Sequence, residues 1–93
     1  MEENAKKVAE LLKVLANENR LLILCALLDG PKTVGEIAAF VPNITQSALS
    51  QHLGVLKANG VLDNRKSGQN STYFIDDHRV EKVLAVLKEY YCQ

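Results

Sequence analysis

The chain has 93 residues, of which 47% are apolar, and its eleven basic and eleven acidic residues give a formal net charge of zero. This composition excludes a disordered chain, and residues 1–93 are expected to form a single domain with a modest core. No apolar run approaches the ~20 residues that cross a membrane. The charged start MEENAKKVAELLK lacks the apolar core of a signal peptide, so we expect a cytoplasmic location.

Apolar residues at helical spacing predict two helices at the start of the chain. The first is amphipathic, covers about residues 3–16 and is marked by Val8, Leu11, Leu12 and Leu15. Asn17 is the expected N-cap of the second helix, over residues 18–28. Because its segment RLLILCALL is apolar on almost every side, this helix is expected to be the central buried one.

A third helix is predicted from its start signal. Thr33 and Glu36 have the spacing of a capping box, in which each side chain satisfies a backbone N–H of the other residue. Pro42 and Asn43 end the helix. Its expected inward stripe consists of Val34, Ile37, Ala38 and Val41.

The fourth predicted helix has an unusual polar face. Thr45 caps it, Gly60 stops it, and the spacing of Leu49, Leu53 and Leu56 turns these three residues inward. The other face carries short, uncharged side chains where a solvated helix usually carries Glu and Lys: Gln46, Ser47, Ser50 and Gln51. Such amides and hydroxyls suit base edges and phosphates in a major groove. A helix-turn-helix is therefore predicted; the alternative is an ordinary soluble face.

The last third of the chain predicts a hairpin and a final helix. The segment VLDNRKSGQNSTYFI indicates two short strands around a turn at residues 67–70. Asp76 or Asp77 caps the final helix. Apolar residues follow at helical spacing: Val80, Val83, Leu84, Leu87 and Tyr91.

The predicted fold is mainly α with a small β-hairpin, in the order ααααββα, which is a winged helix-turn-helix. The hairpin tip, with Arg65, Lys66 and Gln69, can reach along a DNA backbone into an adjacent groove. Between residues 46 and 75, Lys57, Arg65 and Lys66 oppose Asp63 alone, so this part is locally basic. The candidate DNA contacts are Thr45, Gln46, Ser47, Ser50, Gln51, His52, Arg65, Lys66 and Gln69. His52 is equally well interpreted as a core-edge histidine with a satisfied hydrogen bond.

The outer helices are too apolar for a monomer of this size. Exposed apolar patches on both would be covered if two copies pair through the first and last helices. Such a pair also presents two copies of the fourth helix to a pseudo-palindrome. The expected homodimer interface consists of Leu11, Leu12, Leu15, Val83, Leu87, Tyr90 and Tyr91.

Three segments together resemble the ArsR/SmtB family of bacterial winged-helix repressors. They are LKVLANENRLLIL, QSALSQHLGVLKANGVL and the hairpin RKSGQNSTYFI. The resemblance implies a homodimer that binds operator DNA and responds to a small inducer. The family's DNA-contacting positions match Gln46, Ser47, Ser50 and Gln51, and His52 matches a neighbouring His/Gln position.

Many members of that family sense metals, and here the chain departs from the pattern. Where one family motif supplies thiolates, the segment GEIAAFV has Ala38 and Phe40. Without thiolates or imidazoles a soft divalent ion has no ligands there. At a second family metal site, on the last helix, Asp77 matches the family's Asp ligand. Arg79 stands at the family's His position and Tyr90 at the later ligand position. An out-of-phase set of Asp76, His78, Glu89 and Cys92 leaves a non-standard metal site as an alternative; an N-capping Asp and a solvated His is the simpler interpretation. No metal site and no cofactor are predicted.

Two cysteines are the remaining candidates for a site that senses an inducer. Cys25 lies in the second helix and Cys92 near the end of the last. This placement resembles the BigR-like and HlyU-like branch of the family, which senses reactive sulfur or oxidants through two thiols that become linked. The resemblance implies redox sensing by Cys25 and Cys92, with a persulfide or an oxidant as inducer. A lone cysteine in such a helix is otherwise a small buried apolar residue.

An enzyme is not predicted. The sequence has no Gly-rich phosphate loop and no Ser-His-Asp or Cys-His arrangement with a pocket. The alternative from another class is a winged-helix module that binds protein partners instead of DNA. Its best support is the net charge of zero, because phosphate neutralisation supplies most non-specific affinity for DNA.

Overall fold

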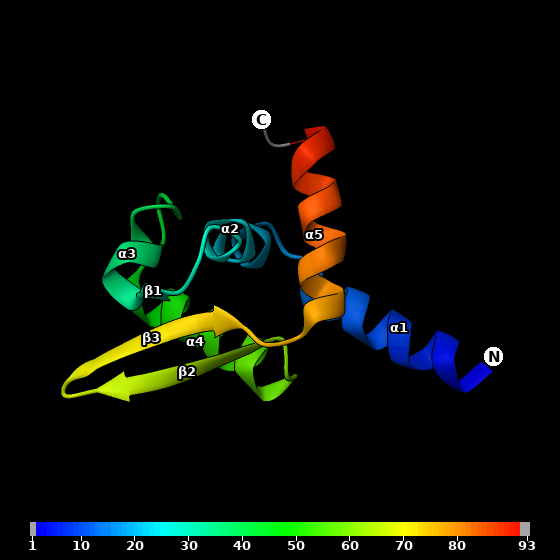
Figure 1. Cartoon of the computed structure of the whole chain (residues 1–93), viewed down its shortest axis with the longest axis horizontal. Coiled ribbons are helices and arrows are strands. Elements are labelled where there is room, and N and C mark those ends of the chain that lie inside the picture. The colour runs from blue at the N-terminus through cyan, green and yellow to red at the C-terminus, as the bar shows by residue number, and fades with distance from the viewer. Residues whose placement is uncertain (1, 92–93) are drawn as a thin grey trace.

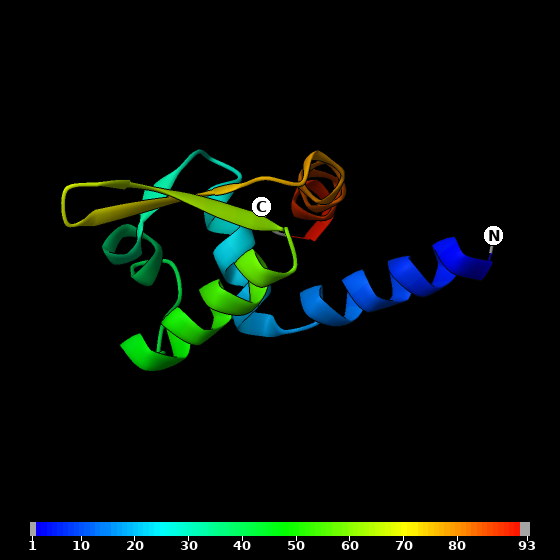
Figure 2. The ribbon, with the colours of Figure 1, turned by 90° about the horizontal axis from the view of Figure 1, so that it is seen from below.

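The computed structural model describes residues 2–91, beginning with two helices, α1 (Glu2–Leu15) and α2 (Glu18–Leu27). Asn17 separates them and caps α2, because its Oδ1 accepts a hydrogen bond from the backbone N–H of Arg20 at 3.1 Å. α2 lies in the middle of the molecule, and α1 projects away from the rest (Figures 1 and 2). The prediction of a central second helix is confirmed, since Ile23, Leu24 and Leu27 are buried.

A two-residue strand, β1 (Lys32–Thr33), leads directly into α3 (Val34–Ala38). The predicted capping box at the start of α3 is present in both directions. Thr33 Oγ1 accepts from the N–H of Glu36 at 3.2 Å, and Glu36 Oε1 accepts from the N–H of Thr33 at 2.9 Å. These hydrogen bonds stabilise the carboxylate and hold the pKa of Glu36 below its ordinary value.

α4 (Gln46–Ala58) begins and ends where local sequence signals predict. Thr45 Oγ1 accepts from the N–H of Ala48 at 3.1 Å and so caps the helix. At the other end, the N–H of Gly60 donates to the carbonyl of Lys57, and the N–H of Val61 donates to that of Leu56. This pair of bonds is a Schellman motif, for which Gly60 adopts a φ of +75°.

The hairpin consists of β2 (Leu62–Ser67) and β3 (Asn70–Ile75), with Leu62 opposite Ile75 and Ser67 opposite Asn70. Its two-residue turn has Gly68 at a φ of +63°, a conformation that glycine adopts without strain. β1 pairs antiparallel with the other edge of β3, so the sheet order is β1-β3-β2. The predicted hairpin is thus confirmed, and it belongs to a three-stranded sheet.

The last helix, α5 (His78–Tyr91), stands beside α2 (Figure 1). Of the two candidate caps, Asp77 performs the role. Its Oδ1 accepts from the N–H of Arg79 at 2.9 Å and from that of Val80 at 3.4 Å. The Arg79 guanidinium also bonds this carboxylate, and together these donors hold the pKa of Asp77 below its ordinary value.

The buried apolar side chains of residues 2–91 form one cluster, to which α1 to α5 and the strands β2 and β3 contribute. Its members are Leu15, Ile23, Leu24, Leu27, Ile37, Val41, Leu49, Leu53, Leu56, Val61, Leu62, Ile75, Val80 and Leu84. The three leucines of α4 are all nearly inaccessible, as their spacing predicts. Burying a leucine side chain stabilises the fold by roughly 2 kcal/mol.

Three expectations need correction. The predicted order ααααββα omits β1, because a strand of two residues shows no periodicity. Ala38 is exposed, since α3 ends at Ala38 and the chain turns before Val41 enters the core. Leu15 belongs to the core of the subunit and is withdrawn from the expected dimer surface.

No helix within residues 2–91 has the length and apolar character that a membrane span requires.

Candidate nucleic-acid interface

α4 presents its predicted polar rim to solvent. Leu49, Leu53 and Leu56 hold one side of the helix in the core, which leaves the opposite side outward. The exposed rim consists of Gln46, Ser47, Ser50 and Gln51. Lys57 is the one charged residue of this helix, and its first turn has no acidic side chain. The rim therefore offers hydrogen-bond donors and acceptors together with the positive end of a helix dipole, which suits base edges and phosphates.

His52, next to this rim, is half-buried and already has a hydrogen-bond partner. Its Nδ1 accepts a hydrogen bond from Nε of Arg20 in α2 at 3.2 Å. In this contact Nδ1 is the acceptor, which leaves Nε2 as the other hydrogen-bonding atom of the ring. The structure therefore contains the satisfied hydrogen bond of one sequence interpretation. Arg20 itself was not singled out from the sequence, because nothing local links it to a residue so far along the chain.

The β2–β3 hairpin, which we call the wing, carries the three predicted polar residues on its exposed part. Arg65, Lys66 and Gln69 are all exposed, and Gln69 lies in the turn itself. Across the hairpin, Asn64 Nδ2 donates to Ser71 Oγ at 2.6 Å, which helps to hold the two strands in register.

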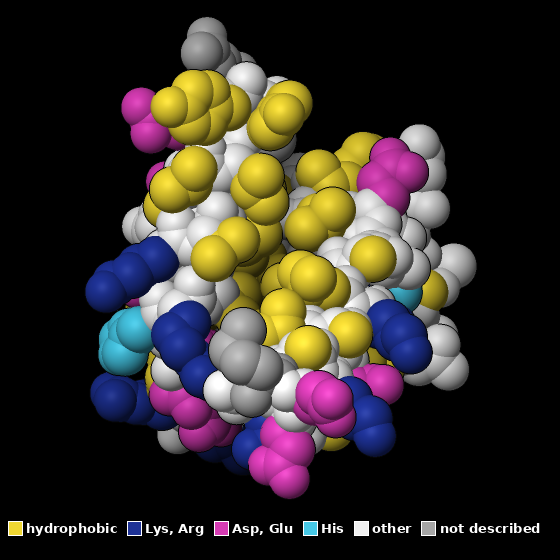
Figure 3. Space-filling view, turned by 90° about the vertical axis from the view of Figure 1, so that its right-hand side faces the viewer, with side chains coloured by type: hydrophobic (Ala, Val, Ile, Leu, Met, Phe, Trp, Pro, Cys, Tyr) yellow, Lys and Arg dark blue, Asp and Glu magenta, His cyan; other side chains and the backbone are white. Residues whose placement is uncertain are grey.

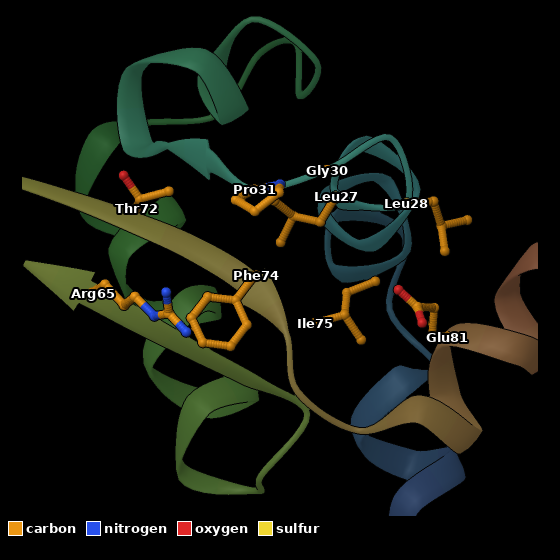
Figure 4. Close-up of a pocket in the computed structure, with 9 residues that line it drawn as sticks. All are labelled: Leu27, Leu28, Gly30, Pro31, Arg65, Thr72, Phe74, Ile75 and Glu81. Carbon is orange, nitrogen blue, oxygen red and sulfur yellow. The ribbon is translucent and has the colours of Figure 1, made fainter.

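Arg65 is oriented by an aromatic side chain of the neighbouring strand. Its guanidinium carbon lies 5.4 Å from the centre of the Phe74 ring, within the range of a cation–π contact. Figure 4 shows the two side chains together on one face of the hairpin, beside the end of α2. The contact leaves the charge of Arg65 at the surface while restricting its flexible stem.

Apolar side chains gather on the face formed by α1 and α5 (Figure 3). We define the apolar α1–α5 face by its most exposed large residues, which are Val8, Leu12, Val83, Val86, Leu87, Tyr90 and Tyr91. Leu11, another predicted interface residue, is half-buried and lines a groove between the two helices. Of the residues in α1, Leu15 alone is buried within the subunit. A 14-residue helix with so little packing is marginally stable by itself, so this face needs a cover.

Of the two cysteines, Cys25 alone lies within the described residues. Cys25 is half-buried in α2, whereas Cys92 lies outside the described residues. Lys88 Nζ in α5 lies 3.3 Å from Asp29 Oδ1, just beyond the end of α2. This ion pair joins the last turns of α5 to the segment that follows the helix containing Cys25.

Two residues of the candidate metal sites on α5 have other roles: Asp77 of the in-phase family site and His78 of the out-of-phase alternative. Asp77 caps α5, and the exposed His78 has its Nδ1 3.5 Å from Glu81 Oε1. In the family's thiolate segment, the Phe40 ring lies 5.4 Å from Lys32 Nζ. Within residues 2–91, no group of three or more His, Cys, Asp or Glu side chains is arranged to hold a metal ion.

A helix-turn-helix followed by a hairpin wing defines the chain as a winged-helix protein. The chain belongs to the arsR family of bacterial regulatory proteins, whose family model matches residues 17–64. It is 43% identical to the transcriptional activator HlyU of Vibrio cholerae over 93 residues, which are 100% of this chain and 85% of that protein. The protein is thus a transcriptional regulator of this family.

Solved structures agree with this assignment. Reduced HlyU from Vibrio cholerae superposes with a TM-score of 0.93, covering 100% of this chain and 97% of that one. The transcriptional repressor BigR from Xylella fastidiosa gives 0.88 at 33% identity, covering 100% and 94%. The homodimeric winged helix-turn-helix domain Mb0332 from Mycobacterium bovis gives 0.81 at 29% identity, covering 96% and 82%. These relatives are regulators or DNA-binding domains rather than enzymes, which confirms the prediction that the chain is not an enzyme.

Proposed function

We propose that the protein is a homodimer that binds operator DNA through α4 and the wing, and that oxidation of Cys25 and Cys92 releases it. The observation that carries the DNA part is the exposed, uncharged rim of α4 beside an exposed basic hairpin. Direct readout requires hydrogen-bonding side chains that reach base edges, and the rim offers four of them: Gln46, Ser47, Ser50 and Gln51.

Homodimerisation is supported by the apolar α1–α5 face. The face combines residues from both ends of the chain, and a relative of 29% identity is described as homodimeric. A second copy of the same chain is the simplest cover for it, because a two-fold axis places like surfaces against each other. The same axis would present two α4 helices to the two half-sites of an operator.

The DNA proposal is tested by a gel shift with the promoter region of the protein's own gene. Gln51→Ala is expected to weaken binding to that region by about tenfold, the effect of losing one base contact, with binding to unrelated duplex unchanged. Lys66→Ala is the matched control for a phosphate contact. It should weaken binding to both duplexes equally. The slope of the logarithm of the binding constant against the logarithm of the salt concentration should become smaller in magnitude by about 1. Retention of neither duplex at any salt concentration would contradict the proposal and favour the protein-partner module.

Thiol control is supported by the two cysteines, by the ion pair between Lys88 and Asp29, and by the similarity to HlyU, for which a reduced form has been solved. In the proposed step a two-electron oxidant, a peroxide or a polysulfide, accepts two electrons from the two thiols. Both S–H bonds break and one S–S bond forms between the two cysteines. With hydrogen peroxide its O–O bond breaks and two molecules of water leave; with a polysulfide one of its S–S bonds breaks and its two fragments leave as hydrogen sulfide or a shorter polysulfide carrying the two protons. The new bond would pull the end of α5 against α2 and so change the position of α4.

Single serine substitutions test this control. Cys25→Ser and Cys92→Ser are each expected to bind the promoter as tightly as wild type but to stay bound after polysulfide or peroxide treatment. The reason is that neither variant has a second thiol, since the chain contains two cysteines. Wild-type protein treated in the same way should be released and should bind again after reduction with dithiothreitol. Normal release of either variant would exclude the switch.

The metal-responsive alternative is decided by the same preparations. Stoichiometric zinc in purified wild-type protein that is absent from Cys92→Ser would favour a non-standard site near the end of α5.

A further inference from the structure

Arg20 joins three parts of the molecule through hydrogen bonds. Its backbone N–H donates to Asn17 Oδ1 at 3.1 Å, at the corner between α1 and α2. Its guanidinium Nη1 donates to the carbonyl of Val14 at 2.9 Å, in the last turn of α1. Its Nε donates to His52 Nδ1 at 3.2 Å, in the middle of α4. One half-buried side chain thus contacts the end of α1 and the outward-facing helix α4.

We propose that Arg20 is a positioning residue that fixes the orientation of α4 relative to α1, an inference that rests on the proposed DNA-binding function. α1 carries part of the apolar α1–α5 face, and α4 carries the rim that would meet the bases. The angle between them decides how two α4 helices of a dimer are presented to one duplex. Arg20 contacts both elements, so it is placed to set that angle.

The geometry favours this role over simple stabilisation of α2. Leu49, Leu53 and Leu56 anchor α4 by apolar packing, which has no preferred direction and tolerates small rotations of a helix about its axis. A hydrogen bond is directional and weakens steeply when its angle changes. His52 directly follows Gln51 of the rim, so the bond to Arg20 restricts rotation at the point where rim side chains point outward.

The end of α1 is restrained by the same guanidinium. The carbonyls in the last turn of a helix lack partners within that helix, and a cation there also interacts favourably with the helix dipole. The Val14 carbonyl is in this last turn. A shift of α1 at a dimer interface would therefore be transmitted through Arg20 to His52, without a change in the leucine packing of α4.

Five variants separate positioning from stabilisation. Arg20→Met keeps the apolar stem and removes both side-chain donors. His52→Leu removes the acceptor, and His52→Asn keeps an acceptor near the position of Nδ1; both lose Nε2, so their difference isolates the bond to Arg20. The fourth and fifth variants combine Arg20→Met with His52→Leu and with His52→Asn. Lys82→Met, an exposed residue of α5, is the control for the loss of one positive charge.

Promoter affinity, affinity for unrelated duplex and dimer mass are measured for each variant. Arg20→Met and His52→Leu should each weaken promoter binding on the order of tenfold, and the double variant no further, because both remove one coupling. His52→Asn should bind more tightly than His52→Leu in the wild-type background and equally in the Arg20→Met background. Affinity for unrelated duplex should stay within about twofold of the Lys82→Met control. The mass of each variant should remain that of a dimer.

Two results would overturn the inference. One is an additive loss in the double variant, and the other is an equal loss of promoter and unrelated-duplex affinity in Arg20→Met. If the wild-type protein binds no duplex, the proposed function fails. The positioning role is then tested by the NMR resonances of the backbone amides. Arg20→Met should shift the backbone amide resonances of both Gln51 and Leu15. A shift confined to residues of α2 would contradict the positioning role.

Discussion

Leu87→Glu is expected to convert the proposed dimer into a monomer and to lower promoter affinity on the order of 100-fold or more. Leu87 is 44% exposed in the single subunit, in the middle of the apolar α1–α5 face. Pairing of two copies would bury this position, and an ionised carboxylate loses its hydration there without gaining a partner. Two linked binding sites gain a factor of about 10²–10⁴ over one, and a monomer loses that factor.

Ala85→Glu is the matched control for this substitution. Ala85 is exposed on the same helix and lies away from Val83 and Leu87 around the helix axis, so it receives the same carboxylate on the solvent side. Analytical ultracentrifugation should give a dimer for Ala85→Glu and a monomer for Leu87→Glu, with the same helical content by circular dichroism. A dimer of Leu87→Glu with normal promoter affinity would show that a different surface joins the subunits.

Leu53→Ala is expected to lower the free energy of unfolding by about 3 kcal/mol, within the range for a buried leucine. Leu53 is 1% exposed and lies between Leu49 and Leu56 on the inward side of α4. The substitution leaves a cavity beneath the proposed DNA-binding helix, so promoter affinity should fall together with stability. Leu21→Ala, at a position that is 37% exposed, should cost about 1 kcal/mol or less.

Urea unfolding of both variants measures the difference. The protein concentration must be the same in every experiment, because the proposed dimerisation would make apparent stability depend on concentration. If Leu53→Ala is no less stable than Leu21→Ala, the leucine stripe does not anchor α4 and the outward direction of the rim loses its basis.

Local signals made most of the elements predictable. The caps at Asn17, Thr33 and Thr45 each bond a backbone N–H three positions away, so the interaction is contained in a short segment. The Gly60 stop is equally local. Strict apolar spacing then determined which side of α4 enters the core, and with it the exposure of Gln46, Ser47, Ser50 and Gln51.

Long-range pairing made other features unpredictable. β1 exists because Lys32 and Thr33 lie opposite Tyr73 and Thr72, and two residues carry no strand pattern of their own. Ala38 has the right spacing to face inward, but the helix ends there and the chain turns. Leu15 continues a stripe that otherwise faces solvent, and it is buried because α1 meets the rest of the molecule at its last turn.

The sequence by itself determined where α2, α3 and α4 begin, where α4 stops, the wing and the chemistry of the α4 rim, because these depend on residues a few positions apart. The tertiary structure alone decided the bond between Arg20 and His52 and the ion pair between Lys88 and Asp29. Each of these pairs joins helices whose mutual position depends on how the whole core packs. A side-chain contact between distant segments leaves no periodic trace in either segment, so it becomes visible when the fold brings them together.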